Sequence, residues 1–256
     1  MKAQDRRKAY ALLKEIVTQY RAILGGNLVG MYLHGSLAFD CFRWEASDID
    51  FLVVVQVPPS PDEKLALLRI LSGLERSAPP KGFEMSVVLE RECLHFRYPT
   101  PFELHYSNAH AARFQSDPAA YCATMHGTDP DLAAHFTVIR SVGRALWGKP
   151  IFAVFGDVPR EAYLRSILAD VSGAENDVAS VYIVLNLCRV LAYARDGLVL
   201  SKAQGGRWAL AHLPQADARA VSAALASYEG GAPFALDAAV FQAFAHSMLN
   251  RIHLLL

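Results

Sequence analysis

Two aspartates stand one residue apart where a strongly apolar segment begins. Asp48 and Asp50 flank Ile49, and the chain continues as FLVVV, a pattern typical of a buried β-strand. Residues i and i+2 of a strand point to the same side, so the two carboxylates are expected to project together. Like charges this close repel each other unless a cation lies between them. Because carboxylate oxygens suit hard cations, the pair predicts a Mg²⁺ site; a strand cap or a surface pair of acids is the alternative.

A Gly-Ser pair precedes these acids at the end of another apolar segment, residues 28–34. Gly35 has no Cβ atom, so a phosphate group can approach its backbone closely. Ser36 offers a hydroxyl and an N–H group at an expected helix N-terminus, where anions are favoured. We therefore expect a phosphate site beside the metal site. A plain strand-to-helix turn would use the same residues.

A third acid, Glu84, lies at the start of the apolar segment 83–89. A carboxylate between Phe83 and Met85 is unfavourable in a buried strand unless it has a partner. On a strand adjacent to Asp48 and Asp50, Glu84 could ligate the metal ion, or accept a proton from an attacking hydroxyl group as a general base. An edge-strand glutamate in contact with solvent is the alternative.

The elements that must position these residues divide the chain into two parts. In the first, helical spacing over 5–24 and 62–77 alternates with predicted strands at 28–34, 49–55 and 83–89. After residue 108 helical patterns dominate, separated by Gly and Pro, over 131–146, 159–170, 176–196, 216–228 and 237–254. We therefore predict an α+β fold with a small mixed sheet and flanking helices in residues 1–107, followed by an all-α helical bundle in residues 108–256.

Composition narrows the classes of partner. Hydrophobic residues make up 53% of the 256 residues and the formal net charge is zero, so the chain can bury a sizeable core and no global attraction to nucleic acid or anionic membranes is indicated. No apolar run approaches about 18 residues, and the N-terminus lacks the pattern of a signal peptide. The four cysteines are scattered without a CxxC pair. We expect a cytoplasmic monomer with reduced cysteines.

The order of these motifs resembles the polymerase-beta-type nucleotidyltransferase superfamily: Gly35-Ser36, eleven residues, Asp48-Ile49-Asp50, and then Glu84 on a later strand. Three further segments are similar to the aminoglycoside adenylyltransferases that modify spectinomycin and streptomycin. They read FRYPTPFELHYS (96–107), TDPDLA (128–133) and YIVLNLCRVLAYARDGLVLSKAQGGRWALAHLP (182–214). The resemblance spans nearly the whole chain, in order and with similar spacing.

The resemblance implies a two-domain enzyme with ATP and Mg²⁺ bound between its halves. Residues 1–107 would be the nucleotidyltransferase domain, and residues 108–256 a helical domain that binds substrate and nucleotide. By similarity, Asp48 and Asp50 hold Mg²⁺, Ser36 in the Gly35-Ser36 pair contacts a phosphate, and Glu84 is the catalytic base. The same similarity assigns four residues to the nucleotide: Asp131, Arg189, Lys202 and Tyr228.

The residues themselves agree with two of these assignments. Arg189 lies in an apolar helical segment and needs an oxygen partner there, such as a phosphate or a carboxylate. Lys202 follows Gly197, just past an expected helix end, where a long cationic side chain could reach out of its domain. A structural salt bridge for Arg189 and a solvated surface position for Lys202 are the alternatives.

The implied activity is transfer of AMP from ATP to a hydroxyl group of an aminoglycoside antibiotic, a resistance function. The family's streptomycin-holding tryptophan corresponds to Ala109 here, an aspartate to Glu175, and another acid to Ala179. Alanine offers no aromatic face and glutamate reaches one methylene further than aspartate, so we expect a preference for the 9-hydroxyl of spectinomycin, with Glu84 and Glu175 near the drug. Alternatives are a nucleotidyltransferase acting on an unknown metabolite, protein or RNA, and a non-catalytic nucleotide-binding protein.

Overall fold

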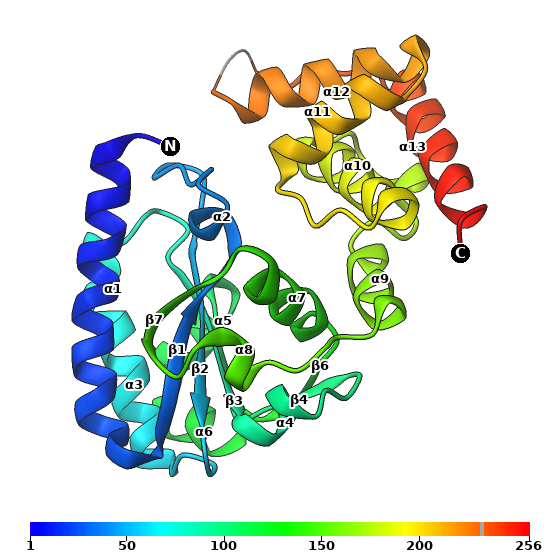
Figure 1. Ribbon diagram of the computed structural model, residues 1–256. Coiled ribbons are helices and arrows are strands. Elements are labelled where there is room, and N and C mark those ends of the chain that lie inside the picture. Colours follow the sequence, from blue (N-terminus) through cyan, green and yellow to red (C-terminus); the bar gives the residue numbers. More distant parts are fainter. Residues whose placement is uncertain (231–232) are drawn as a thin grey trace. The chain divides into compact units, whose positions relative to one another are not determined.

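The computed structural model describes residues 1–230 and 233–256, which form two compact units, Met1–Val158 and Pro159–Leu256 (Figure 1). The first unit is built on a five-stranded sheet with the order β5-β3-β2-β1-β7. The strands are β1 (Leu28–Leu33), β2 (Ile49–Val55), β3 (Phe83–Leu89), β5 (Leu104–Tyr106) and β7 (Arg144–Gly148). β2 and β3 run parallel and the other neighbours antiparallel, so the sheet is mixed. A separate antiparallel pair joins β4 (Thr100–Phe102) to β6 (Gly127–Asp129).

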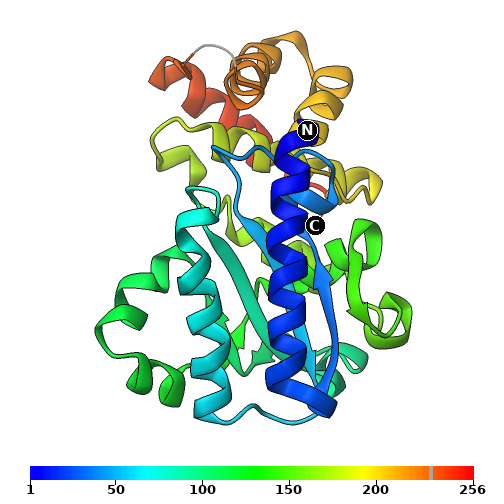
Figure 2. The same cartoon turned by 90° about the vertical axis from the view of Figure 1, so that its left-hand side faces the viewer.

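Helices cover both faces of the five-stranded sheet. Helices α1 (Ala3–Leu24) and α3 (Pro61–Leu74) lie side by side over one face (Figure 2). Helices α7 (Leu132–Val142) and α8 (Ile151–Val154) lie over the other. Shorter helices complete the unit: α2 (Gly35–Ala38), α4 (Glu90–Leu94), α5 (Asn108–Ser116), α6 (Pro118–Thr124) and the 3₁₀ turns Gly25–Asn27 and Glu75–Ser77.

The apolar residues of β2 serve both faces in alternation. Phe51 and Val53 pack in the core beneath α1 and α3, whereas Leu52 and Val54 pack in the core beneath α7 and α8. A strand buried on both sides is apolar throughout, which is why the sequence reads as a continuous run rather than as an alternating pattern. By the same alternation, Asp50 lies on the side of the sheet that α7 covers.

The second unit is helical. Its elements are α9 (Arg160–Ala169), the 3₁₀ turn Ala174–Asn176, α10 (Val181–Asp196), α11 (Lys202–His212), α12 (Gln215–Tyr228) and α13 (Ala238–His253). Helix α10 is the central one, since it contacts α9, α11, α12 and α13. Its N-terminus is capped by the Ser180 hydroxyl, and it ends at Gly197 in the left-handed conformation that glycine adopts without strain. A capping box of Ser201 and Gln204 starts α11.

The predicted α+β fold is confirmed, and the three predicted strands 28–34, 49–55 and 83–89 agree with β1, β2 and β3. The helix predicted over 131–146 is wrong at its end, because α7 stops at Val142 and Gly143 leads into β7.

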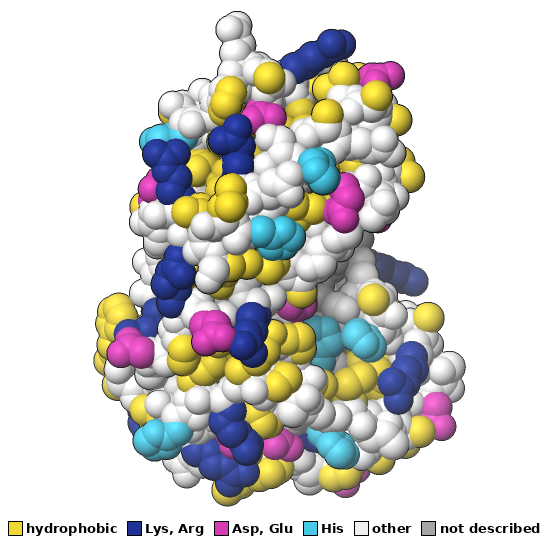
Figure 3. Space-filling view, turned by 90° about the vertical axis from the view of Figure 1, so that its right-hand side faces the viewer, with side chains coloured by type: hydrophobic (Ala, Val, Ile, Leu, Met, Phe, Trp, Pro, Cys, Tyr) yellow, Lys and Arg dark blue, Asp and Glu magenta, His cyan; other side chains and the backbone are white. Residues whose placement is uncertain are grey.

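Within the described residues, no helix has the length and apolarity needed to cross a membrane. Charged side chains of both signs are scattered over the face drawn in Figure 3.

The division between the compact units lies at residue 158 rather than at the predicted boundary after residue 107. Residues 108–158 pack with the first unit for a physical reason: β7 completes the sheet by pairing with β1, and α6 packs against α3. Local helical patterns gave no sign of this, because residues 108–142 are mostly helical and only their packing assigns them to the sheet.

We therefore predict that residues 1–158 fold as an isolated fragment and that residues 1–107 do not. The shorter fragment lacks β7 and the buried α7 residues Phe136 and Ile139, so it would expose the apolar face of β2 formed by Leu52 and Val54. Thermal unfolding followed by circular dichroism should be cooperative for 1–158 alone. A cooperative transition for 1–107 would contradict the prediction.

Candidate active site

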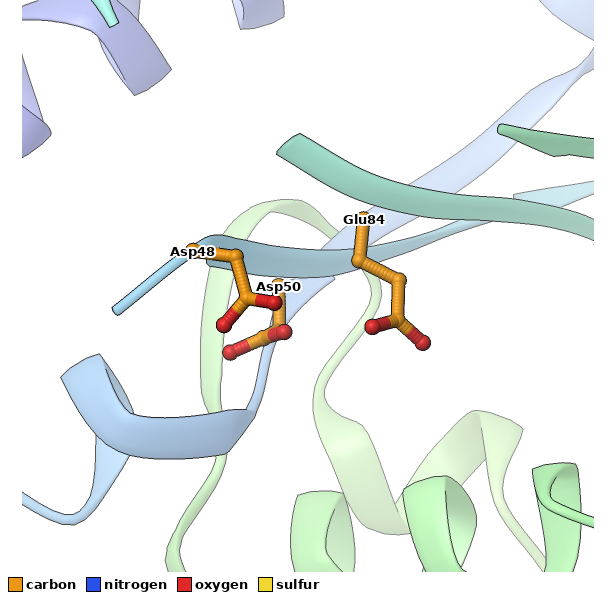
Figure 4. Close-up of side chains that lie close together, drawn as sticks. All are labelled: Asp48, Asp50 and Glu84. Atoms are coloured by element: carbon orange, nitrogen blue, oxygen red, sulfur yellow. The ribbon is translucent and has the colours of Figure 1, made fainter. Parts of the chain in front are cut away.

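The pairing of β2 with β3 brings the predicted acids together. In the parallel register Asp50 lies opposite Glu84, and Asp48 directly precedes β2. All three side chains extend to the same side of the sheet (Figure 4). One carboxylate oxygen from each of Asp48, Asp50 and Glu84 lies within 4.8 Å of the others. The structure thus places three acids, distant in sequence, around one small volume.

Gly35 makes room for one of these acids. Its φ is +60°, and a Cβ atom there would lie 2.9 Å from the Cβ of Asp50 and closer still to its carboxylate. Only glycine combines this conformation with such a close approach. The sequence predicted that a phosphate group can approach the Gly35 backbone. The structure adds that Gly35 leaves space for Asp50, which is buried with 8% of its surface exposed.

Ser36 follows within the single helical turn of α2. Its Oγ atom is buried and has no hydrogen-bond partner among the residues that the structure describes. Buried hydroxyl groups ordinarily have a partner, so an unpartnered one beside the acids suits a ligand oxygen. This agrees with the predicted phosphate contact, which stays a prediction.

The three acids fit a hard divalent cation. Their donors are all carboxylate oxygens, the ligands that Mg²⁺ prefers, and their spacing allows more than one of them to reach the same ion. Mutual repulsion of the carboxylates would be relieved by that ion. Asp48 and Asp50 are the predicted ligands, and Glu84 lies within reach of the same position.

The charge of Glu84 is set by its surroundings. Burial raises the pKa of the Glu84 carboxyl; His135 opposes the rise, and the nearby acids Asp48, Asp129 and Asp131 add to it. Nε2 of His135 lies 3.6 Å from Oε1 of Glu84. Asp131, the residue before α7, therefore interacts electrostatically with Glu84, and its contact with a nucleotide stays a prediction.

Histidines near these acids were not identified from the sequence. The rings of His34 and His135 contact each other at a tilt, with centroids 4.5 Å apart, and burial keeps the pKa of His34 well below its usual value. His105 interacts electrostatically with Asp129 and His135, and burial lowers the pKa of His105 to about 4. His34 lies between β1 and α2, His105 in β5 and His135 in α7, so no spacing in the sequence relates them. The position of His34 directly before Gly35 was the signal that the sequence offered.

The remaining predicted residues belong to the second unit. Arg189 Nε donates to the carbonyl of Leu200 and Nη1 donates to Oδ1 of Asn186. The ammonium group of Lys202, the first residue of α11, lies 5.0 Å from the ring centroid of Tyr182. Tyr182, missed from the sequence, also hydrogen-bonds Asp170.

Two further predicted residues lie elsewhere in this unit. Tyr228 is the last residue of α12, and Glu175 lies in the 3₁₀ turn before α10. Oε2 of Glu175 is buried and has no hydrogen-bond partner in the described part of the chain, while Oε1 accepts from Asn176. The roles assigned to these residues stay predictions.

Comparison with known proteins matches residues 153–251 to the model of the aminoglycoside adenylyltransferase C-terminal domain. The fold of the whole chain is similar to the crystal structure of spectinomycin adenyltransferase AAD(9) from Enterococcus faecialis with ATP and spectinomycin, at a TM-score of 0.78 and 19% identity over 95% of this chain and 99% of that one. A search of curated protein sequences found no match. The match of residues 153–251 agrees with the predicted family resemblance, and the structural likeness confirms the fold.

We predict that Gly35→Ala destabilises the protein and weakens binding of Mn²⁺, used as a probe for the divalent site. The new methyl group would force Asp50 to move and would strain a residue with φ of +60°. Urea unfolding should show a loss of roughly 1–3 kcal/mol. Gly73→Ala is the matched control, since this helical glycine has no atom within 4 Å of the new Cβ, and alanine there should stabilise α3. Equal effects of the two substitutions would refute the role of Gly35.

The lowered pKa of His105 predicts that the free energy of unfolding depends on pH. Its pKa is about 4 in the folded protein and about 6.5 when unfolded, so between these values the unfolded chain binds more protons. The free energy of unfolding should therefore fall as pH falls from 6.5 towards 4, by up to about 1.4 kcal/mol per pH unit from this group. His105→Gln should make the decline between pH 6.5 and 5 shallower in urea titrations, whereas replacement of the exposed His95 by Gln should not. An unchanged slope in His105→Gln would contradict this.

Proposed function

We propose that the protein transfers AMP from ATP to a hydroxyl group of an aminoglycoside-type antibiotic, with release of pyrophosphate. The observation that carries the proposal is the convergence of Asp48, Asp50 and Glu84 beside the Gly35-Ser36 turn. The second unit adds support, because residues 153–251 match a domain family named for this activity. The similar fold of a spectinomycin adenyltransferase, crystallised with ATP and spectinomycin, is consistent with it.

Asp48 and Asp50 would hold Mg²⁺, which when bound offsets negative charge on the phosphate oxygens. Their two carboxylates would bind the ion together at the start of β2. Ser36 would donate the hydrogen of its unpartnered hydroxyl to a phosphate oxygen. These contacts orient the nucleotide, and orientation is a large part of what proteins contribute to phosphoryl transfer.

Glu84 would act on the acceptor. As the acceptor oxygen bonds to the α-phosphorus, the bond from that phosphorus to the pyrophosphate oxygen breaks, and the hydroxyl proton passes to the Glu84 carboxylate. A carboxylate with a raised pKa is a stronger base than an ordinary glutamate, which favours this step. From the second unit, Arg189 and Lys202 would offset charge on the departing pyrophosphate, and Tyr228 would contact the triphosphate. From the first unit, Asp131 would lie at the nucleotide.

For the acceptor we propose spectinomycin in preference to streptomycin, with transfer to its 9-hydroxyl group. Ala109 and Ala179 provide neither an aromatic face nor a carboxylate at positions that the family uses for streptomycin. Glu175 retains a carboxylate, which suits a cationic drug. Spectinomycin is a smaller, rigid aminocyclitol, so it requires fewer of these contacts than streptomycin does.

The direct test incubates the purified protein with Mg-ATP and a panel that includes spectinomycin, streptomycin and other aminoglycosides. We expect pyrophosphate release and a product whose mass exceeds that of the drug by one adenylyl group. We also expect a higher kcat/KM for spectinomycin. Absence of transfer to every drug would overturn the activity, and an equal or higher kcat/KM for streptomycin would overturn the preference alone.

Within that assay, Glu84→Gln is predicted to lower kcat by about 10²–10⁴-fold, because the amide cannot accept a proton. Its affinity for Mg-ATP, measured by calorimetry, should stay close to that of the parent protein. Glu15→Gln, at an exposed position on α1, is the matched control and should turn over at the parent rate. A parent-like kcat in Glu84→Gln would assign proton transfer to another group.

A further inference from the structure

Two histidine rings that contact each other lie beside Glu84. His135, in the first turn of α7, places its Nε2 atom 3.6 Å from Oε1 of Glu84. Its ring packs against that of His34, with the two planes tilted by 31°. His135 is therefore in contact both with the proposed base and with the residue that precedes the Gly35-Ser36 turn.

Two contacts limit where the His135 side chain can lie. Its backbone N–H donates to the carbonyl of Asp131 within the first turn of α7, which sets where the side chain leaves the helix. Its ring packs against that of His34, which is 4% exposed and whose backbone N–H donates to the carbonyl of Asp50 in β2. The His135 ring therefore lies against a buried residue that is hydrogen-bonded to the strand of Asp50.

The ring presents a donor where Glu84 needs one. A neutral imidazole with its hydrogen on Nε2 can donate to the carboxylate. This tautomer leaves Nδ1, which is buried and has no hydrogen-bond partner within residues 1–230 and 233–256, as an acceptor. The separation of 3.6 Å is longer than an ordinary hydrogen bond, as is common at catalytic groups before substrates bind. One oxygen of Glu84 would face His135, which leaves the other free to turn toward an acceptor.

We propose that His135 is a positioning residue that orients the Glu84 carboxylate for proton acceptance. His135 acts through Glu84 rather than on the substrate, and His34 provides the surface against which its ring is held. This inference rests on the proposed function, since it concerns the orientation of the proposed base. A purely structural histidine in the same place would fill space between α7 and β1 without regard to its hydrogen-bond donor.

Two substitutions separate these roles. His135→Leu keeps a comparable volume and removes the donor, whereas His135→Gln restores an N–H donor near the position of Nε2. For AMP transfer to the best acceptor of the panel, we expect kcat to fall by about 10–100-fold in His135→Leu, with the KM for Mg-ATP changed by less than about threefold. His135→Gln should recover most of the loss. His95→Gln, at an exposed histidine of the same unit, should match the parent.

The kinetic result overturns the proposal if kcat in His135→Leu stays within about twofold of the parent, or if Leu and Gln variants lose activity equally. Thermal unfolding of each variant shows whether a loss reflects the fold. A second measurement needs no acceptor: ¹⁵N–¹H correlation NMR of the His135 ring should report hydrogen on Nε2, and its shift should change in Glu84→Gln but not in Glu15→Gln.

The two arms keep the inference distinct from the proposed function. If the parent transfers AMP to no drug, the proposed function fails, while the NMR arm still decides whether His135 Nε2 contacts Glu84. An Nε2 signal that does not respond to Glu84→Gln overturns the contact and the positioning role with it. A parent that transfers AMP, together with an unaffected His135→Leu variant, overturns the inference alone.

Discussion

The parallel pairing of β2 with β3 is the constraint on which the rest of the site depends. It fixes Asp50 opposite Glu84, and the side-chain alternation along β2 sends Asp48 and Asp50 to the same side of the sheet. A shift of one residue in this register would turn Glu84 to the opposite face. The apolar residues that follow in both strands are buried on two faces, and they hold the register against the repulsion of the acids.

Three carboxylates within 4.8 Å of one another are costly for a protein, and their surroundings reduce the cost in part. His135 is the group that opposes the raised pKa of Glu84, and the Gly35 backbone leaves space for Asp50. Negative charge is thus gathered where two neighbouring strands begin. A cation site needs its negative charges in place before the cation binds. The repulsion among the carboxylates and their proposed function therefore have the same physical origin.

Local pattern predicted the elements that carry the acids, because β1, β2 and β3 are short apolar runs bounded by turn residues. It also predicted that Asp48 and Asp50 project together, which follows from the two-residue period alone. Glu84 was placed by the assumption of adjacent strands and by family resemblance, and the register confirms the adjacency. His34 and His135 were missed because their contact depends on how α7 packs against the end of β1, which no spacing in the sequence encodes. β7 was missed for the same reason, since its pairing with β1 joins residues more than a hundred positions apart.

The two units hold charge in complementary ways. In the first, acids gather around a volume suited to a cation. In the second, Arg189 is held inside an apolar helix by the carbonyl of Leu200 and the amide oxygen of Asn186, both neutral. Neutral acceptors fix the guanidinium and limit its desolvation penalty without cancelling its charge, as a carboxylate partner would. A positive group kept in this way favours an anionic ligand. Each unit of this chain forms its own arrangement by local packing, the acids through strand pairing and the guanidinium through its neutral acceptors.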